Sequence, residues 1–352
     1  MYTLRKRIRR FIITVYHALS IDKVRMFLGG FDKQIDSAIN KYGSDSRLSK
    51  KDLKTDIKRS YYRYLTTPDE YFLFGFDGEK ENYRRSFLSD NLRVRYLLKT
   101  VSEKKYDEEL SDKYNFYKIA SKYFNREVIK IGPGETITFA EFSLFVTQHQ
   151  NLFVKPVSST FGRGAHILRI KKGTETVELN KLYQKYRESS WIMEELIIQS
   201  PLMSQWNNSS VNTVRLPCIL NNGKFNILNP FFRTGRKGKV VDNAGGGGVF
   251  ACVDEKTGIV ITDGFDELNV YHSIHPDSGI VFKGWQIPDW EELIKLAELI
   301  FRTCFPDHKY IGFDFALTND GWVLIEGNWG QFVGQYVSKQ GIRDKFVHYI
   351  NN

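Results

Sequence analysis

A hairpin near the C-terminal end of the chain constrains the fold most strongly. Over residues 310–330, YIGFDFALTNDGWVLIEGNWG, apolar and polar residues alternate on both sides of an Asn-Asp-Gly turn signal at 319–321. A three-residue loop pairs the two strands symmetrically, so we expect Asp314 to face Glu326. Asn328 then lies two residues further along, on the same side of the sheet as Glu326.

The exact register depends on the length of the turn. A three-residue loop also places Ala316 opposite Leu324 and Thr318 opposite Trp322. A two-residue turn at 320–321 would instead shift the register by one residue and leave the two acids diagonal to each other. In both registers the acids stay within reach of a single metal ion.

The acidic pair itself indicates a bound cation. Two carboxylates on directly opposite residues, with Cβ atoms about 5 Å apart, repel each other unless positive charge lies between them. Asp314, Glu326 and Asn328 offer hard oxygen ligands, which suit Mg²⁺ bridging nucleotide phosphates better than Zn²⁺, whose usual ligands are His and Cys. A solvated surface hairpin has the same local pattern, so the remaining motifs decide between these interpretations.

A second motif is typical of a phosphate-binding loop. Residues 151–170, NLFVKPVSSTFGRGAHILRI, predict two strands around a loop rich in Ser, Thr and Gly, with Lys155 at the end of the first strand. Such a loop offers N–H groups and hydroxyls to phosphate oxygens, and Lys155 adds a positive charge. The loop fits neither a Walker motif nor a dinucleotide fingerprint, and a purely structural turn is the alternative. The candidate phosphate-binding residues of the loop are Ser158, Ser159, Thr160, Gly162 and Gly164.

Further candidates lie downstream of this loop. In WIMEELIIQ, Glu194 and Glu195 end an apolar strand, where an adenosine could take backbone hydrogen bonds and a carboxylate could bind a ribose hydroxyl. Arg215, Arg233 and Arg236 lie in or beside predicted strands, and the planar guanidinium of arginine suits phosphate or carboxylate groups. Exposed arginines on strands that only contact solvent are the alternative.

Two more segments are expected in loops. Residues 242–248, DNAGGGG, are too permissive for regular structure, so we expect either a mobile hairpin tip or a loop that closes over substrate. His272 and His275 lie three residues apart beside Pro276 without other nearby metal ligands, and we expect them in a surface loop.

The composition describes a globular chain with excess positive charge. The chain has 352 residues, 41% of them hydrophobic, and a formal net charge of +10. This charge favours anionic partners such as nucleotides, acidic sugars, nucleic acid or an anionic lipid surface, without choosing among them. Cys218, Cys252 and Cys304 lie far apart without CxxC spacing. This argues against a zinc ribbon or a secreted disulfide framework and favours a reducing cytoplasm.

The first twenty residues, MYTLRKRIRRFIITVYHALS, predict a basic amphipathic helix. This pattern is typical of a helix that contacts an anionic membrane surface, and a helix docked on its own domain is the alternative. The chain has no run of about 18 apolar residues and no secretory signal. We therefore expect a cytoplasmic protein, with peripheral contact to the inner membrane surface as the further expectation for this helix.

The pattern of elements changes along the chain. Charged helical segments rich in tyrosine fill residues 31–125, and short β-rich runs alternate with helical patterns from about residue 126. Strands and hairpins dominate the last third. We therefore expect an α+β fold with a helical basic lobe over 1–110, a smaller lobe with the phosphate loop and hinge over 111–200, and a larger lobe with the metal site over 201–352.

Taken in order, these motifs resemble the ATP-grasp superfamily, and more narrowly its sugar-transfer associated branch, which is found with capsule and other surface-polysaccharide genes. The segments that carry the resemblance are FVKP with SSTFGRG, EE, SVNTVR, NPFFRTGRKGKVVDNAGGGG and GFD…IEGN, within roughly residues 45–340. The resemblance implies an ATP-grasp fold, in which two α+β lobes clasp ATP, with ATP and Mg²⁺ as cofactors. The helical first lobe departs from better-known ATP-grasp ligases and leaves the substrate open.

The resemblance also implies roles for individual residues. Lys155 would bind the nucleotide phosphates, and a further lysine of the smaller lobe, Lys118 or Lys130, would join it; we favour Lys118. Arg215 and Arg233 would lie near the transferred phosphoryl group. The implied adenosine hinge is Glu194, Glu195 and Leu196, and the implied Mg²⁺ ligands are Asp314, Glu326 and Asn328.

The superfamily implies a carboxylate–amine ligase. ATP would phosphorylate a carboxylate, and an amine would then attack the acylphosphate. We expect the carboxylate to belong to an acidic sugar, such as a hexuronic acid of a surface polysaccharide or its precursor, and the amine to be an amino acid or another amine; no nucleic acid takes part. The alternatives are an ATP-grasp kinase that phosphorylates a sugar or polyol hydroxyl, and a basic membrane- or nucleic-acid-binding module without catalysis.

Overall fold

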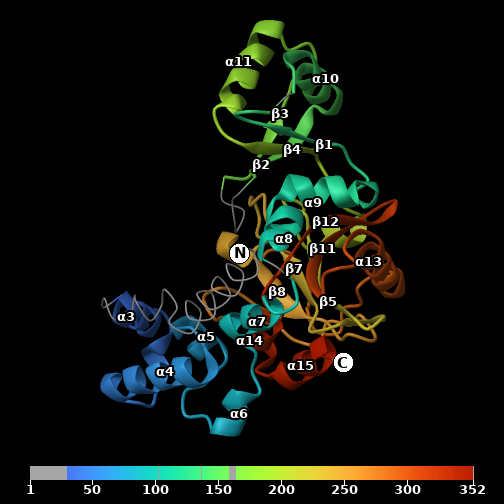
Figure 1. Cartoon of the computed structure of the whole chain (residues 1–352). Helices are drawn as coiled ribbons and strands as arrows, with labels where there is room; N and C mark the ends of the chain where they lie inside the picture. Colours follow the sequence, from blue (N-terminus) through green and yellow to red (C-terminus); the bar gives the residue numbers. More distant parts are fainter. Residues whose placement is uncertain (1–29, 102, 136, 158–163, 352) are drawn as a thin grey trace, which may run out of the picture. The chain divides into compact units, whose positions relative to one another are not determined.

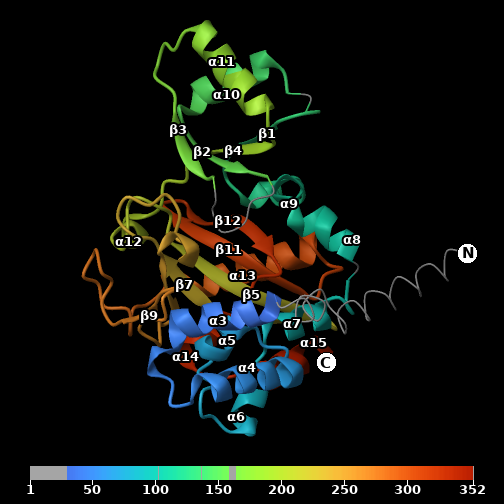
Figure 2. The same cartoon turned by 90° about the vertical axis from the view of Figure 1, so that its left-hand side faces the viewer.

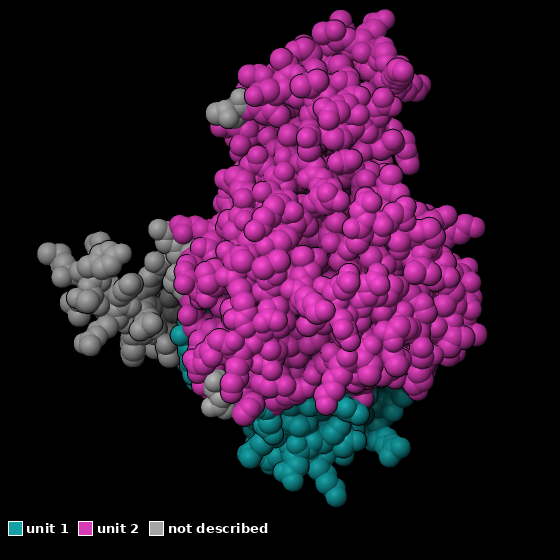
Figure 3. All heavy atoms as spheres, turned by 90° about the vertical axis from the view of Figure 1, so that its right-hand side faces the viewer, with its two compact units in different colours: residues 1–99, 339–344 teal, residues 100–338, 345–352 magenta. Residues whose placement is uncertain are grey.

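A computed structural model describes residues 30–101, 103–135, 137–157 and 164–351. The predicted N-terminal amphipathic helix lies outside these residues. The chain forms two compact units, residues 1–99 with 339–344 and residues 100–338 with 345–352 (Figure 3). The predicted boundaries at residues 110 and 200 divide the chain differently and stay a prediction. In the described part of the chain, no helix combines the length and apolar character needed to cross a membrane.

The first unit is helical, as predicted for the N-terminal lobe (Figure 1). The hydroxyl of Ser49 accepts the N–H of Asp52 and caps the second helix, and Thr67 forms a capping box with Glu70 at the start of the third. Buried aromatic side chains, among them Tyr71, make up much of the core of this unit. Its helices are α3 (Gly30–Tyr42), η1 (Gly43–Asp45), α4 (Lys50–Tyr64), α5 (Pro68–Leu73), α6 (Glu81–Arg85) and α7 (Asp90–Leu97).

A short C-terminal segment, residues 339–344, completes the first unit. The ammonium of Lys339 donates to the carbonyl of Leu73 at 2.7 Å, and the hydroxyl of Tyr83 donates to the carbonyl of Lys339 at 3.2 Å. The N–H of Arg343 donates to the carbonyl of Ser86 at 2.9 Å. The helical unit is therefore built from two stretches that lie far apart in the sequence.

The second unit contains a small antiparallel sheet in the order β1-β4-β2-β3. Its strands are β1 (Val128–Ile131), β2 (Asn151–Pro156), β3 (His166–Arg169) and β4 (Trp191–Glu195). Helices α10 (Phe139–His149) and α11 (Thr176–Arg187) cover one face, where Phe142, Val146 and Tyr183 pack on Val154 and Met193 (Figures 1 and 2). Before this sheet the chain forms α8 (Glu103–Tyr106), the π-helical turn η2 (Asp107–Ser111), α9 (Lys113–Ala120) and η3 (Ser121–Tyr123).

A larger eight-stranded sheet occupies the rest of the second unit, in the order β10-β9-β8-β7-β5-β11-β12, with β6 paired to β5. Its strands are β5 (Thr213–Asn221), β6 (Lys224–Ile227), β7 (Phe231–Thr234), β8 (Val249–Cys252), β9 (Gly264–Phe265), β10 (Tyr271–His272), β11 (Tyr310–Thr318) and β12 (Gly321–Asn328). Helix α13 (Trp290–Cys304) buries Leu293 and Ile300 in the same core as Phe313 of the sheet. The remaining helices are α12 (Pro201–Ser204), η4 (Ala244–Gly246), α14 (Gly334–Ser338) and α15 (Arg343–Asn351).

The C-terminal hairpin confirms the predicted position of the two acids but not the predicted turn. Thr318 pairs with Gly321, so the turn holds two residues, 319–320, and the predicted pairs Ala316–Leu324 and Thr318–Trp322 are wrong. A β-bulge between Asp314 and Phe315 takes up the shift of one residue and brings Asp314 opposite Glu326. The extra residue of the bulge therefore restores the register that a longer turn would have given.

Candidate functional site

Four neighbouring strands of the large sheet, in the order β7-β5-β11-β12, bring charged residues together. Arg215 of β5 lies opposite Asp314 of β11, which lies opposite Glu326 of β12 on its other side. On the far side of β5, Arg233 of β7 pairs with Thr213. The register therefore aligns Arg215, Asp314 and Glu326 across three strands, and Arg233 lies two residues beyond the position opposite Arg215. We call these four charged residues, which come from distant parts of the sequence, the row of charges.

The centre of this row is a buried ion pair. Arg215 donates through Nε and Nη2 to the two carboxylate oxygens of Asp314, with the Nη2 bond at 2.6 Å. Its Nη1 donates to Oδ1 of Asn328 at 3.2 Å. Burial by itself would raise the pKa of Asp314, but the guanidiniums of Arg215 and Arg233 hold it below its usual value. Asp314 is therefore an anion locked between two cations.

Arg233 extends the row towards the glycine-rich segment. Its Nη2 lies 2.8 Å from Asp314, and its Nε donates to the hydroxyl of Thr213 at 2.8 Å. The same hydroxyl donates to the carboxylate of Asp242, which lies 3.5 Å from Nε of Arg233. Burial raises the pKa of Asp242 above its usual value. Asp242 thus anchors the start of the glycine-rich segment beside the two arginines.

The glycine-rich segment forms a folded turn at this anchor. The carbonyl of Asn243 accepts the N–H groups of Gly246 and Gly248, both at 3.0 Å. A Cβ atom at Gly248 would lie 2.0 Å from the carbonyl oxygen of Asp242, so only glycine allows this close approach. Whether this turn moves over a substrate stays a prediction.

The positive charge expected beside the acids is thus found in arginines. Because Arg215 and Arg233 neutralise Asp314, repulsion between Asp314 and Glu326 no longer requires a metal ion. Among the residues that the structure describes, no three or more His, Cys, Asp or Glu side chains are grouped to hold a metal. The predicted ligand set has only two carboxylates plus the amide of Asn328, whose Nδ2 lies 3.4 Å from Glu326. Its chemistry is still that of a hard-cation site with three oxygen donors on one face.

A second charged cluster lies on the small sheet. Glu194 of β4 is only 4% exposed, and its carboxylate forms an ion pair with Lys155 of β2. Arg126 donates through Nε and Nη2 to the same carboxylate, at 2.8 and 2.6 Å. Burial by itself would raise the pKa of Glu194, but Lys155 and Arg126 lower it to about 2. The carboxylate of Glu194 therefore forms ion pairs with two cations.

The predicted adenosine hinge has a second carboxylate, which is partly exposed. The side chain of Glu195 is 44% exposed, with a ring nitrogen of His149 at 3.8 Å. The N–H groups of Glu195 and Leu196 donate within the small lobe, to the carbonyls of Glu127 and Asn151. A nucleotide base at this hinge would therefore use other backbone groups than these two N–H donors, and Glu195 is the carboxylate available to a ribose.

The structure places three further lysines of the second unit, and the predicted role of Lys118 or Lys130 in binding ATP stays a prediction. Lys118 is exposed, with its ammonium over the ring of Tyr114, and Lys130 forms an ion pair with Glu135 at 3.0 Å. Lys113, at the start of α9, has its ammonium 3.4 Å from the carbonyl of Val157, which directly precedes the phosphate loop. Burial lowers the pKa of Lys113, and nearby Lys155 acts in the same direction, whereas Glu326 opposes the shift. Lys113 therefore joins the two charged clusters electrostatically.

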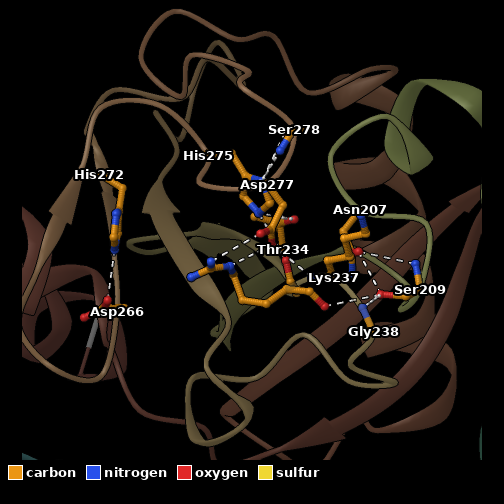
Figure 4. Close-up of polar contacts among 12 residues, drawn as sticks. Asn207, Ser209, Thr234, Lys237, Gly238, Asp266, His272, His275, Asp277 and Ser278 are labelled. Atoms are coloured by element: carbon orange, nitrogen blue, oxygen red, sulfur yellow. Dashed lines mark hydrogen bonds and ion pairs between the residues drawn. The ribbon is translucent and has the colours of Figure 1, made fainter.

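Arg236 is not brought into the row of charges. It forms an ion pair with Asp277 at 2.7 Å, and the N–H of Lys237 donates to the same carboxylate at 2.9 Å. Figure 4 shows Lys237 and Gly238 in one loop, whose N–H groups reach Asp277 and Ser209. The contacts of Arg236 therefore hold the loop that follows β7.

The expectation of a surface loop is wrong for His275. Its side chain is buried, with Nε2 3.1 Å from the carbonyl of Gly235 and Nδ1 3.2 Å from the N–H of Ser278 (Figure 4). His272 is partly exposed and pairs with Asp266 at 2.9 Å. Neither histidine takes part in the row of charges on β7, β5, β11 and β12.

Part of the phosphate loop lies outside the described residues. Ser158, Ser159, Thr160 and Gly162 belong to this part, so their predicted contacts with phosphate stay predictions. Gly164, at the end of the loop, has a φ of +79°, which favours glycine. A Cβ atom there would lie 3.0 Å from the ring of Pro156, next to Lys155.

The sequence interpretation missed several residues of these clusters. Arg126, Lys113, Thr213 and Asp242 lie outside the residues that we selected. Thr213 belongs to the SVNTVR segment and Asp242 to the DNAGGGG segment, so the sequence indicates their motifs without indicating the two residues themselves. Lys113 follows an acidic N-cap residue at the start of a predicted helix, which is a weak signal. Nothing in the sequence around Arg126 distinguishes this buried residue from arginines expected at the surface.

Comparison with solved structures finds ligases and a synthase of low sequence identity. They include a D-alanine–D-alanine ligase from Bacillus anthracis (15% identity, TM-score 0.37, covering 68% of this chain and 63% of that structure). A second is an L-amino acid ligase from Bacillus licheniformis (13% identity, TM-score 0.39, covering 69% of this chain and 48% of that structure). A third is an ATP complex of carboxyaminoimidazole ribonucleotide synthase from Aspergillus clavatus (11% identity, TM-score 0.37, covering 64% of this chain and 46% of that structure). This chain thus spans less than two thirds of each of these proteins, and the likeness says nothing about its substrates.

Comparison with protein families gives the decisive match. A search of curated protein sequences finds no significant match. The model of the sugar-transfer associated ATP-grasp family matches residues 91–350, which is most of the chain. This match confirms the resemblance and the ATP-grasp fold class predicted from the sequence. The chain therefore belongs to the sugar-transfer associated ATP-grasp family.

Proposed function

We propose that this chain is an ATP- and Mg²⁺-dependent carboxylate–amine ligase that acts on an acidic sugar. The observation that carries the proposal is the row of Arg233, Arg215, Asp314 and Glu326 across four strands. Two guanidiniums held in place by one buried carboxylate form a rigid anion-binding group, and the neighbouring acid and amide supply oxygen ligands for a cation. This combination suits the transfer of a phosphoryl group.

Each cluster has a separate task in this proposal. Lys155 and Lys113 bind the phosphates of ATP, and Glu195 binds the ribose. Glu326, Asn328 and Asp314 would hold Mg²⁺, which when bound neutralises phosphate charge. Their three oxygens lie on one face, but Asp314 and Asn328 also accept hydrogen bonds from Arg215, so the metal and the arginine share these ligands.

The reaction has two steps. A carboxylate oxygen of the substrate attacks the γ-phosphorus, an O–P bond forms, and the bond from phosphorus to the β,γ-bridging oxygen breaks to release ADP. Arg215 and Arg233 stabilise the charge that develops on the transferring group. The amine nitrogen then attacks the acyl carbon and a C–N bond forms. The bond from the acyl carbon to the bridging oxygen breaks, so that phosphate leaves with this oxygen, and the nitrogen gives up a proton to solvent.

The acidic sugar is proposed from the family and from charge. The family is described as sugar-transfer associated, and the chain has a net charge of +10, which favours an anionic substrate. A hexuronic acid of a surface polysaccharide or its precursor combines the sugar with the carboxylate that the chemistry requires. The amine is an amino acid or another small amine.

Product analysis tests this function. The chain is incubated with Mg-ATP, candidate uronic acids and candidate amines, and ADP and products are measured by mass spectrometry. The proposal predicts an amide that forms only when acid, amine and ATP are all present. Accumulation of a stable phosphorylated sugar without amide would instead establish a kinase. Glu326→Gln should be inactive, whereas Arg169→Gln, at an exposed position of β3, should retain activity.

A further inference from the structure

Arg126 connects the two charged clusters of the second unit. It precedes β1, and its side chain is only 3% exposed. While Nε and Nη2 bind Glu194, Nη1 donates to the carbonyl of Leu324 in β12 at 2.8 Å and to the carbonyl of Phe124 at 3.1 Å. One buried guanidinium therefore joins a strand of the small sheet to the strand that carries Glu326.

Strand β12 offers this connection because it is an edge strand. It ends the order of the large sheet, and in the described part of the chain its strand partner is β11 alone. An edge carbonyl lacks a strand partner, and burial without a hydrogen bond would cost free energy. Arg126 satisfies the carbonyl of Leu324, two residues before Glu326. The contact thus fixes the small sheet at the metal-binding end of the hairpin.

The charges around Glu194 give Arg126 a second effect. If Glu194 had only Lys155 as partner, the two charges would cancel, and the ammonium would offer an anionic phosphate little net attraction. Arg126 adds a second cation to the same carboxylate, so the group of three carries one net positive charge. A buried net charge is weakly screened and acts strongly on a nearby anion.

We propose that Arg126 is a positioning residue for nucleotide binding, which neutralises Glu194 and thereby leaves the charge of Lys155 available to the phosphates of ATP. This inference rests on the proposed function, because it takes Lys155 as a phosphate ligand. It adds a residue that no motif of the sequence identified. Arg126 acts through Glu194, and its hydrogen bond to the carbonyl of Leu324 also links the small sheet to β12.

A charge-compensation series separates this role from a merely structural one. Arg126→Gln leaves Glu194 and Lys155 with no net charge, whereas the double variant Arg126→Gln with Glu194→Gln restores one net positive charge. The probe is AMP-PNP with Mg²⁺, measured by isothermal titration calorimetry at two salt concentrations. We expect Arg126→Gln to weaken binding about tenfold and the double variant to recover most of this loss, from the size of Coulomb interactions in a partly buried site.

A matched control tests whether the loss of any positive charge from the small sheet weakens AMP-PNP binding to the same extent. Arg169 is exposed at the end of β3 and pairs in register with Asn151, at the opposite end of β2 from Lys155. Arg169→Gln removes the same unit of charge from the same sheet, and we expect AMP-PNP affinity to change less than twofold. Thermal unfolding of each variant shows whether the fold is retained.

The outcomes are distinguishable from failure of the proposed function. If the unaltered chain does not bind AMP-PNP, the proposed function fails before Arg126 is tested. If the unaltered chain binds and Arg126→Gln binds equally well, the positioning role is wrong. If the double variant binds no better than folded Arg126→Gln, the loss comes from broken contacts with β12 and the charge argument is overturned.

Discussion

Asp314 of β11 lies directly opposite Arg215 of β5, and its buried carboxylate accepts hydrogen bonds from both Arg215 and Arg233. A carboxylate in this position has a structural role as well as a chemical one. Removal of one partner from a buried ion pair leaves the other charge without compensation, which costs more than the pair itself contributes. The two acids of the hairpin should therefore respond differently to substitution.

Asp314→Asn should destabilise the chain. Arg215 and Arg233 would then lie together in a buried site with no carboxylate between them. We expect the free energy of unfolding to fall by about 3–5 kcal/mol. Denaturant unfolding followed by circular dichroism measures this change, and a loss below about 1 kcal/mol would show that the ion pair contributes little.

Glu326→Gln should leave stability nearly unchanged. Glu326 is partly exposed and forms an ion pair with no arginine among the described residues, so we expect a change within about 0.5 kcal/mol. Thermal stabilisation by Mg-ATP should nevertheless disappear, because the proposed metal loses a carboxylate ligand. Full stabilisation of Glu326→Gln by Mg-ATP would remove Glu326 from the metal site.

Gly330→Ala should disturb Arg215. A Cβ atom at this position would lie 2.1 Å from Nη1 of Arg215, so the guanidinium must move. We expect a loss of about 1–3 kcal/mol in unfolding free energy, as for other overpacked sites. The cost should shrink in an Arg215→Lys background, where Nη1 is missing. An equal cost in both backgrounds would place the strain elsewhere.

Low pH should decrease the free energy of unfolding, partly because Glu194 becomes protonated. Its pKa is about 2 in the folded chain, below the ordinary value of 4.5, because Lys155 and Arg126 stabilise the anion against the cost of burial. A lowered folded pKa gives stability that is present above pH 4.5 and is lost as the pH falls towards 2. Glu194→Gln should flatten the dependence of unfolding free energy on pH in this window. Glu188→Gln, at an exposed position, serves as control and should not change the slope.

The sequence predicted those parts of the site that depend on local pattern. Alternation along 310–330 indicated the hairpin, and Asp314 does face Glu326. The predicted length of the turn was nevertheless wrong. The turn is one residue shorter, and a bulge beside Phe315 compensates for the difference. Single-residue bulges leave no clear mark on the alternation of apolar and polar residues. The helical first lobe and the α+β character of the remainder also follow from local periodicity.

The parts that could not be predicted depend on contacts between distant segments. Arg215 and Asp314 are 99 residues apart, and their pairing follows from the order of strands in the sheet. Arg126 reaches Leu324 across 198 residues. The burial of His275 likewise depends on Gly235 and Trp206, which local polarity around the histidine does not reveal.

Trapping of the activated carboxylate tests the central claim most directly. The chain is incubated with Mg-ATP, a candidate hexuronic acid and hydroxylamine, a strong nucleophile that converts acylphosphates into hydroxamates. The proposed ligase predicts a sugar hydroxamate that forms in proportion to ADP and is absent with Glu326→Gln. ADP release with a phosphorylated hydroxyl and no hydroxamate would contradict carboxylate activation.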